Sequence, residues 1–162
     1  GRIGRHSIRI GTGFGMRVLA FDVLPDQALA AEMGFQYRAL PQVLANADFV
    51  TLHVPLIEGT RHLIDSEALA ATKPGAILVN TSRGGVVDTQ ALKGALASGR
   101  LRGAGLDVLE DERATYHDFG EANVVVTPHL GWYTEGARDR ILQISLDNVR
   151  AWMAGDPTHR VA

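Results

Sequence analysis

The sequence predicts an α/β fold with a doubly wound parallel sheet, and three observations lead to this prediction. Short runs rich in β-branched residues alternate with stretches of helical spacing along the 162-residue chain. The runs are apolar at consecutive positions, which is typical of strands buried on both faces of a parallel sheet. Polar residues follow one run after another, and an open parallel sheet binds its ligands outside the carboxyl ends of its strands.

The strands are predicted from the β-branched runs. In chain order they cover residues 17–22, 48–54, 76–82, 102–108 and 123–129. The polar residues that end or follow them are Asp22, His53, Thr81-Ser82-Arg83, Asp107, Glu112 and His129. Because parallel strands present their carboxyl ends at one edge, we expect these side chains to gather there, although any one of them alone is typical of a turn or a cap.

The helices are predicted from apolar spacing and from their end signals. They cover the stretch opened by residues 1–4, then 26–33, 41–47 and 89–98, and a long amphipathic segment, 134–154. Gly34 and Gly99 stand where a left-handed glycine ends a helix, and Gly155 and Pro157 end the last one. Asp65 or Ser66 caps a further short helix that stops before Pro74.

Composition excludes several classes of function. With 46% hydrophobic residues the chain can bury one core, and a formal net charge of −2 gives no electrostatic footprint for nucleic acid or an anionic membrane. The chain contains no cysteine, which excludes disulfides and is compatible with the cytoplasm, where we expect the protein to be. It has no apolar run near the roughly 20 residues of a membrane span, and its histidines show no metal-ligand spacing.

Two glycine clusters compete as a phosphate-binding loop. Such a loop follows a strand and opens a helix, so that helix N–H groups face the anion. The cluster at residues 11–15 precedes a strand instead, and we expect it to be a helix end and a turn. Gly1-Arg2-Ile3-Gly4 opens a helix, and Asp22 follows Gly4 by 18 residues, close to the roughly 20 that separate a dinucleotide loop from its ribose-binding acid. Gly1 and Gly4 would then be the second and third glycines of a Rossmann-type motif, and we expect its first glycine and preceding strand to be missing from this chain.

The residue at position 22 indicates which dinucleotide would bind. A carboxylate accepts hydrogen bonds from a ribose diol but repels a 2′-phosphate, by about 4 kcal/mol at roughly 4 Å and an effective dielectric near 20. No arginine follows Asp22 directly, so NAD is favoured over NADP. The alternative is that Asp22 only begins a turn at Val23-Leu24-Pro25.

The chain resembles the NAD-binding domain of the D-isomer-specific 2-hydroxyacid dehydrogenase family essentially from end to end. The matching stretches are GRIG, RVLAFD, ADFVTLHVPLIEGTRHLID, TKPGAILVNTSRGGVVDTQAL, GAGLDVLEDE and NVVVTPHLGWYTEGA. The NTSRGGVVD and TPH blocks are far more specific than the glycines. The resemblance implies an NAD-dependent enzyme that interconverts 2-oxo acids and D-2-hydroxy acids, and it also implies a homodimer.

The resemblance further implies three catalytic residues, Arg83, Glu112 and His129. The planar fork of arginine suits a substrate carboxylate beside a carbonyl, histidine can exchange the hydroxyl proton near neutral pH, and a carboxylate beside the imidazole favours its charged form. Taken singly, Arg83 is also typical of a loop cation, His129 of a strand cap, and Glu112 of a solvated acidic run. Its selection within Glu110-Asp111-Glu112 follows the family's register.

The resemblance carries over a set of cofactor contacts as well. Val54 and Pro55 are expected at the adenine, Thr60 at the phosphates and Asp107 near the nicotinamide, and Gly131 is expected to allow close approach. The full predicted set is Gly1, Arg2, Ile3, Gly4, Asp22, His53, Val54, Pro55, Thr60, Thr81, Ser82, Arg83, Asp107, His129 and Gly131. No metal site is expected.

Some questions stay open at the level of sequence. Trp132-Tyr133 resembles the aromatic pair of D-lactate dehydrogenase-like members and favours pyruvate, although helix-start packing explains the pair equally well. Segment 113–121 is expected to be a loop. Family members carry a second, substrate-binding domain, so we expect residues 1–162 to be an NAD-binding fragment, with a gap between strands 17–22 and 48–54. An NAD-sensing interaction module and an inactive fragment are the alternative functions.

Overall fold

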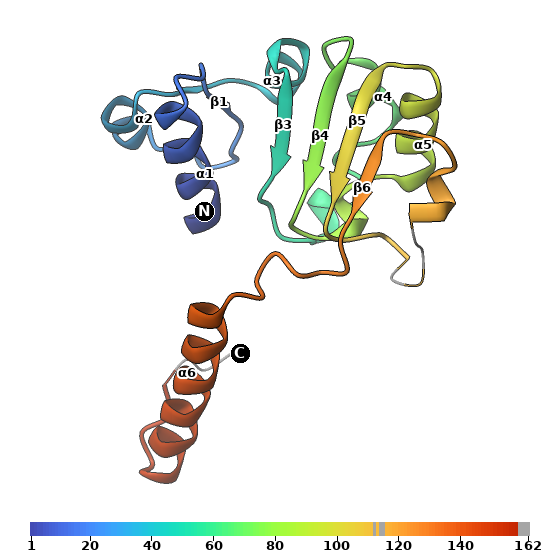
Figure 1. Cartoon of the computed structure of the whole chain (residues 1–162). Coiled ribbons are helices and arrows are strands. Elements are labelled where there is room, and N and C mark those ends of the chain that lie inside the picture. Colours follow the sequence, from blue (N-terminus) through green and yellow to red (C-terminus); the bar gives the residue numbers. More distant parts are fainter. Residues whose placement is uncertain (112, 114–115, 159–162) are drawn as a thin grey trace. The chain divides into compact units, whose positions relative to one another are not determined.

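The computed structural model describes residues 1–111, 113 and 116–158 (Figure 1). The chain divides into two compact units, Gly1–Pro128 and His129–Ala162, and each is described by itself. The first unit contains every strand and five of the helices named below. The second contains one long helix.

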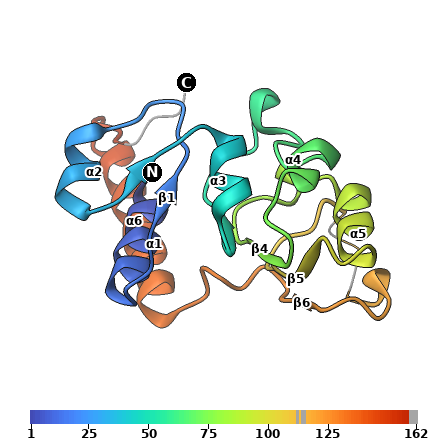
Figure 2. The same ribbon diagram turned by 90° about the horizontal axis from the view of Figure 1, so that it is seen from above.

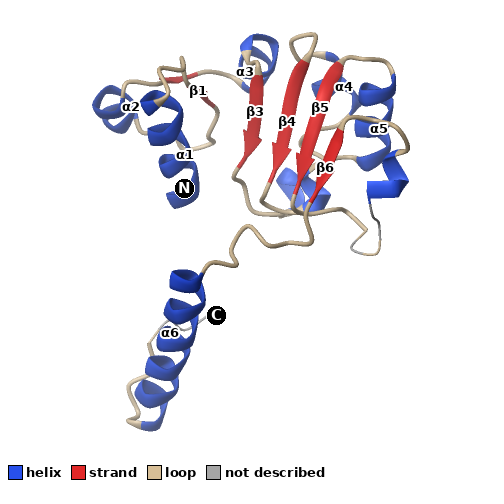
Figure 3. Cartoon of the chain, viewed as in Figure 1, coloured by secondary structure: helices blue, strands red, loops and turns tan. Residues whose placement is uncertain are grey.

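A four-stranded parallel sheet forms the larger part of the first unit (Figure 3). Its strands, in spatial and chain order, are β3 (Phe49–Leu52), β4 (Ala76–Asn80), β5 (Leu101–Leu106) and β6 (Val124–Val126). Leu78 at its centre pairs with Val50 on one side and Ala104 on the other. All the pairs are parallel, which confirms the predicted fold class.

The remaining two strands form a separate sheet. β1 (Leu19–Ala20) pairs in parallel with β2 (Gln36–Tyr37), and neither pairs with β3. The predicted gap between segments 17–22 and 48–54 is therefore confirmed. Strand β2 was not predicted, because a two-residue Gln-Tyr strand carries no readable pattern.

All five predicted strands are shorter in the structure. The predicted segment 17–22 keeps only Leu19–Ala20, because β1 has a ladder partner on one edge alone. At the other strands the polar ends leave the sheet: His53 follows β3, Asp107 follows β5, and His129 lies beyond β6 in the second unit. The predicted strands therefore extended too far at their carboxyl ends, where the chain turns away to form the loops of that edge.

The predicted helices are confirmed to within a few residues. They are α1 (Arg2–Gly13), α2 (Gln27–Met33), α3 (Leu40–Asn46), α4 (Ser66–Ala70), α5 (Thr89–Ala97) and α6 (Glu135–Met153). The Asp65 carboxylate accepts the Ala68 N–H at 2.8 Å and so caps α4. Gly34 ends α2 at φ 71°, a left-handed conformation that favours glycine. Helix α1 ends at Gly13, and the Met16 N–H then bonds to the Gly11 carbonyl, so the second glycine cluster is a helix end and a turn, as predicted.

Helices α4 and α5 pack on one face of the four-stranded sheet (Figure 2). Burial alternates along β4, with residues 76, 78 and 80 buried and residues 77 and 79 half-buried. Consecutive apolar positions predicted burial on both faces of the sheet. Within this chain, the face covered by the helices is the more fully buried of the two. The largest fully buried apolar side chains are Leu44, Ile64, Leu69, Leu78, Val86 and Leu92.

Segment 113–121 was expected to be a loop, and this prediction needs one correction. A 3₁₀ turn spans Tyr116–Phe119, and the Phe119 ring is buried in the core cluster. Burying one large aromatic side chain stabilises a segment that has no periodicity to reveal it.

Candidate functional site

Three loops leave the carboxyl edge of the four-stranded sheet, after β3, β4 and β5. Backbone hydrogen bonds join the first two. The His62 N–H donates to the Gly85 carbonyl at 2.9 Å, the Ile64 N–H to Val86 at 3.1 Å, and the Asp88 N–H returns to Ile64 at 3.1 Å. These loops therefore form one short parallel ladder above the sheet.

The loop after β4 carries Arg83, and a buried amide shapes it. Asn80 is 1% exposed. Its Oδ1 accepts the Ser82 N–H at 3.0 Å and the Ser82 hydroxyl at 2.8 Å, and its Nδ2 donates to the Arg83 carbonyl at 2.9 Å. A buried amide without partners is costly, so these bonds fix the course of the loop. Asn80 was not among the predicted site residues, and its signal was a polar residue ending the apolar run AILVN.

The Arg83 side chain itself lies at the surface. Its Nη1 donates to the Ser82 carbonyl at 2.7 Å, and no ion pair with Arg83 occurs within the described part of the chain. Thr81, beside it, is also exposed. An exposed guanidinium on a fixed loop at the carboxyl edge is suited to binding a substrate carboxylate.

The loop after β5 lies against the Arg83 loop with no room between them. A Cβ atom on Gly84 would lie 2.1 Å from the carbonyl carbon of Leu109 and 2.4 Å from the Glu110 nitrogen. Only glycine permits this approach of two backbones. The second and third loops are thus in direct contact one residue after Arg83.

The acidic run in the third loop is more than a solvated surface. The Glu110 carboxylate contacts His62 Nε2 at 2.7 Å, Arg61 Nη2 at 3.3 Å and the Thr89 hydroxyl at 3.2 Å. The hydrogen bond from His62 is the main reason that the pKa of Glu110 lies below its ordinary value. Glu110 is therefore held by two residues of the first loop and by Thr89, where α5 begins after the second loop.

The joint placement of Arg83, Glu112 and His129 stays a prediction, because Glu112 lies outside the described residues. His129 begins the second unit, with a left-handed φ of 56°, and the Tyr133 N–H near it donates to the Leu130 carbonyl at 2.8 Å. The joint role of the triad and the role of Gly131 in the same unit remain predictions.

Asp107, predicted near the nicotinamide, is buried at the end of β5. It is 7% exposed, its Oδ1 accepts the Thr127 hydroxyl at 2.5 Å, and its N–H donates to the Asn80 carbonyl at 2.9 Å. It lies at the carboxyl edge, and its contact with Asn80 links the end of β5 to the end of β4. Its place near the nicotinamide stays a prediction.

The predicted dinucleotide half of the site lies beside the two-stranded sheet. Asp22 Oδ2 is 4.0 Å from the Gly1 amino nitrogen, so the glycine turn and the acid face each other. Asp22 Oδ1 accepts the Leu24 N–H at 3.0 Å, which is the turn contact of the alternative interpretation. One oxygen of the Asp22 carboxylate thus stabilises the turn at residues 22–24, and the other faces the residues that open α1. Arg2 and Ile3 begin that helix, and both are exposed.

The loop after β3 meets the same helix. A Cβ on Gly4 would lie 3.7 Å from the His53 Cβ, which is ordinary van der Waals contact. Burial is the main cause that lowers the pKa of His53. Further along, Val54 is half-buried and Pro55 exposed, while the Thr60 hydroxyl donates to the Pro55 carbonyl at 2.5 Å and accepts the Ile57 N–H at 2.9 Å. Thr60 closes its own turn, and its phosphate contact stays a prediction.

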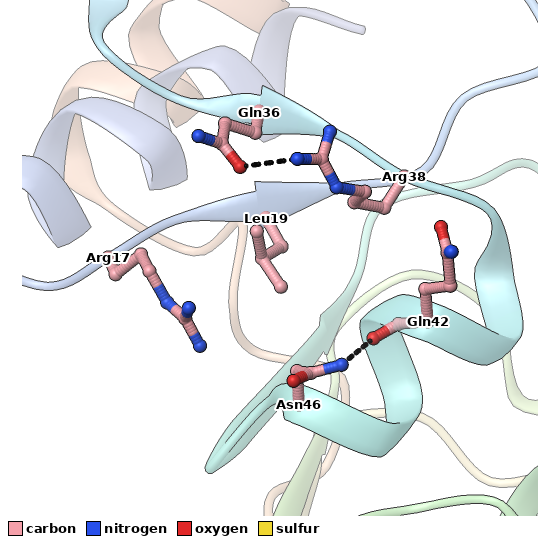
Figure 4. Close-up of a pocket in the computed structure, with 6 residues that line it drawn as sticks. All are labelled: Arg17, Leu19, Gln36, Arg38, Gln42 and Asn46. Carbon is pink, nitrogen blue, oxygen red and sulfur yellow. Dashed lines mark hydrogen bonds between the residues drawn. The ribbon is translucent and has the colours of Figure 1, made fainter.

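A pocket of about 180 Å³ lies elsewhere, between the two-stranded sheet and α3 (Figure 4). Its lining residues are Arg17, Leu19, Gln36, Arg38, Gln42 and Asn46. Arg38 donates to the Gln36 side chain at 2.8 Å, and Asn46 donates to the Gln42 carbonyl at 2.8 Å. None of the predicted site residues lines this pocket.

The described residues contain neither a cluster of metal ligands nor a membrane-spanning helix. Residues 1–111, 113 and 116–158 hold no group of three or more His, Asp or Glu side chains placed to bind a metal ion. In the same part of the chain, no helix combines the length and the apolar character that crossing a bilayer requires.

The chain is similar to part of several known dehydrogenases. Residues 1–131 match the sequence model of the D-isomer specific 2-hydroxyacid dehydrogenase, NAD binding domain. The chain is 45% identical over 157 residues to D-3-phosphoglycerate dehydrogenase of Mycobacterium tuberculosis, covering 96% of this chain and 30% of that protein. It is 44% identical to a glyoxylate reductase of Thermococcus onnurineus, covering 96% of this chain and 47% of that protein.

Solved structures give a consistent comparison. The apo structure of D-lactate dehydrogenase from Escherichia coli matches with a TM-score of 0.91 and 38% identity, over 98% of this chain and 50% of that one. A D-lactate dehydrogenase from Aquifex aeolicus, complexed with NAD and lactic acid, matches with a TM-score of 0.89 and 38% identity, over 96% and 52%. The chain therefore spans 30% to 52% of the length of these relatives.

Proposed function

Because the chain belongs to the D-isomer specific 2-hydroxyacid dehydrogenase family, as its NAD-binding domain, we propose that it serves an NAD-dependent oxidoreductase that interconverts 2-oxo acids and D-2-hydroxy acids. The observation that carries the proposal is the loop after β4. Its course is fixed by buried Asn80, and it presents the exposed guanidinium of Arg83 at the carboxyl edge of the sheet. Ligands of open parallel sheets bind at that edge.

The residues at the turn into α1 fit a dinucleotide. Gly1 faces Asp22 at 4.0 Å, and Gly4 leaves space beside His53. Asp22 would accept the ribose hydroxyls and disfavour a 2′-phosphate. His53, Val54, Pro55 and Thr60 would line the path from adenine to phosphates.

The substrate end of the mechanism is assigned to Arg83, His129 and Glu112. The chemistry that NAD would supply, when bound at this edge, is the transfer of a hydride to or from the substrate. Arg83 holds the substrate carboxylate and polarises the neighbouring carbonyl. His129 gives a proton to the carbonyl oxygen during reduction and takes it back from the hydroxyl during oxidation, and Glu112 favours the charged imidazole.

Further contacts and properties belong to the same proposal. The backbone of Thr81 and Ser82, the Asp107 carboxylate and Gly131 would lie near the nicotinamide. We place the protein in the cytoplasm and expect a homodimer. Among substrates we favour pyruvate, which the Trp132-Tyr133 pair supports, with ring centroids 5.1 Å apart; glyoxylate, hydroxypyruvate and longer 2-oxo acids complete the panel.

The test is NADH oxidation by the full-length gene product with pyruvate, glyoxylate and hydroxypyruvate. Arg83→Lys should cost about 10²-fold in kcat/KM, because an ammonium replaces a bidentate fork. Arg9→Lys, an exposed change on α1 outside the site, is the matched control and should have no effect. His129→Ala should lower kcat by about 10²- to 10⁴-fold, with His6→Ala as its control.

Two outcomes would contradict the assignment. Turnover of none of the acids, with NADH binding intact, would remove the enzymatic function and favour an NAD-sensing module. Equal rates for Arg83→Lys and Arg9→Lys would remove the role of Arg83 while leaving the reaction in place.

A further inference from the structure

The three loops of the carboxyl edge are joined in two different ways. Backbone hydrogen bonds join the loop after β3 to the loop after β4, through His62, Ile64 and Asp88. The loop after β5 has a different attachment at this point: its backbone touches Gly84, and its Glu110 side chain reaches the loop after β3 and Thr89, the first residue of α5. One carboxylate thus contacts the loop after β3 and the helix that directly follows the Arg83 loop.

We propose that Glu110 is a positioning residue, which fixes the loop after β5 against the loop that carries Arg83 and so sets the direction of the Arg83 guanidinium. The Glu110 carboxylate contacts Arg61 and His62 on the first loop. It also accepts the Thr89 N–H at 3.5 Å and the Thr89 hydroxyl at 3.2 Å, at the start of α5. The role given to Arg83 rests on the proposed function, whereas the contacts of Glu110 do not.

The charges around Glu110 favour this attachment. Its neighbours are a guanidinium, an imidazole and the N-terminal end of a nine-residue helix, all of which attract an anion. The other nearby acids have partners of their own: Asp88 caps α5 through the Gln90 and Ala91 N–H groups, and Asp111 pairs with Arg113 at 3.2 Å. Unlike these two acids, Glu110 has hydrogen bonds to segments outside its own loop.

Gly84 explains how this attachment reaches Arg83. Gly84 directly follows Arg83, and its Cα side faces the Leu109–Glu110 peptide with no space for a methyl group. When Glu110 holds that peptide in place, the peptide forms the wall against which Gly84 packs. A displacement of about 1 Å in a substrate-positioning group can cost about 10²-fold in rate.

A role in overall folding alone predicts something different. Ile64, Val86 and Val87 beneath the loops are at most 3% exposed and are held by backbone bonds that do not involve Glu110. Removing the carboxylate leaves this ladder and its core intact. We therefore expect a local loosening of the third loop with a change in the use of substrate.

The kinetic test compares Glu110→Ala with Asp111→Ala in the full-length gene product. Both variants remove one acid from adjacent positions, but the contacts of Asp111 among the described residues are with Arg113 of its own loop. Glu110→Ala should raise KM for the 2-oxo acid about tenfold and lower kcat, while the Kd of NADH stays within about twofold. Glu110→Gln keeps the shape and an acceptor oxygen, so it should recover most of the loss. His62→Gln keeps a donor for the Glu110 carboxylate, so its kcat/KM should exceed that of His62→Ala.

Amide hydrogen exchange provides a readout that needs no turnover. In Glu110→Ala, exchange should rise at least about tenfold at Thr89 and at residues 109–111, and stay unchanged at Ile64 and Asp88. Unchanged exchange at Thr89 would overturn the proposal. The proposal would also be overturned if Glu110→Ala showed faster exchange but had the same KM and kcat as Asp111→Ala. The attachment would then not position Arg83. If the unmutated protein reduces none of the acids, the proposed function fails, and exchange alone decides whether Glu110 fixes the loop.

Discussion

Gly84→Ala tests the close approach of the second and third loops. The added Cβ would lie 2.1 Å from both the carbonyl carbon and the oxygen of Leu109, whereas ordinary van der Waals contact begins near 3.4 Å. The two backbones must therefore separate by more than about 1 Å, and both are held, one by Asn80 and the other by Glu110. Overpacking of this kind costs about 1–3 kcal/mol, and backbone atoms yield less readily than side-chain ends.

The assay is urea denaturation of the full-length gene product, with kcat/KM measured on the same samples. Gly94→Ala is the matched control, because Gly94 lies inside α5 and an added Cβ there meets nothing within 4 Å. The control should stabilise by about 0.5–1 kcal/mol, since alanine is the better helix former. Gly84→Ala should destabilise by about 2 kcal/mol and lower kcat/KM by about 10²-fold.

One result would refute the reasoning about this approach. If Gly84→Ala unfolds at the same urea concentration as the unmutated protein and turns over substrate at the same rate, the two loops are free to separate. The position of Arg83 would then not depend on the contact between Gly84 and Leu109.

Three further predictions concern the same edge and the cofactor turn. Asn80→Leu leaves the Ser82 N–H and the Arg83 carbonyl without their partner, so the free energy of unfolding should fall by about 1–3 kcal/mol in urea denaturation; unchanged stability would contradict the role given to the amide. The pKa of Glu110 is lowered chiefly by the His62 hydrogen bond, so its stabilisation is present above the ordinary glutamate pKa and is lost as pH falls through the lower folded value. Acid unfolding curves of the unmutated protein and Glu110→Gln should therefore converge as the pH falls below the ordinary glutamate pKa, and curves that stay parallel would argue against it. Asp22→Asn removes a charge that repels a 2′-phosphate, so the ratio of the NADPH to the NADH dissociation constant should fall by at least about tenfold, measured by fluorescence titration; an unchanged ratio would show that Asp22 does not meet the ribose.

Local signals made the elements predictable. Asp65 and Gly34 mark helix ends by their own side-chain and backbone chemistry, which needs no knowledge of the rest of the chain. The parallel sheet followed from apolar runs that alternate with helical spacing. Strand β2 and the exact strand ends escaped, because they depend on which neighbour completes the ladder, and β1 has a partner on one edge only.

The candidate site was predictable by position along the chain and less so by contact. Polar residues after each strand indicated the edge at which Arg83 and Asp107 lie. The Glu110 carboxylate contacts His62, which lies 48 residues earlier in the chain, and no local pattern predicts such a pair. The same holds for Asn80, whose burial is decided by the packing of the helices on its face of the sheet.

The arrangement of the two sheets explains why the predicted site has two separable halves. Asp22 follows β1 in the two-stranded sheet, whereas Arg83 follows β4 in the four-stranded sheet, and β1 and β3 share no hydrogen bonds. A dinucleotide that meets Asp22 with its ribose and brings its reactive ring to Arg83 would span the gap between the sheets. Changes at Asp22 should consequently alter the choice of cofactor, whereas changes at Glu110, Gly84 or Asn80 should alter the use of the oxo acid. The reason is that Asp22 follows a strand of the two-stranded sheet and the other three lie in or beside the four-stranded sheet, and the residues of each sheet are held by their own contacts.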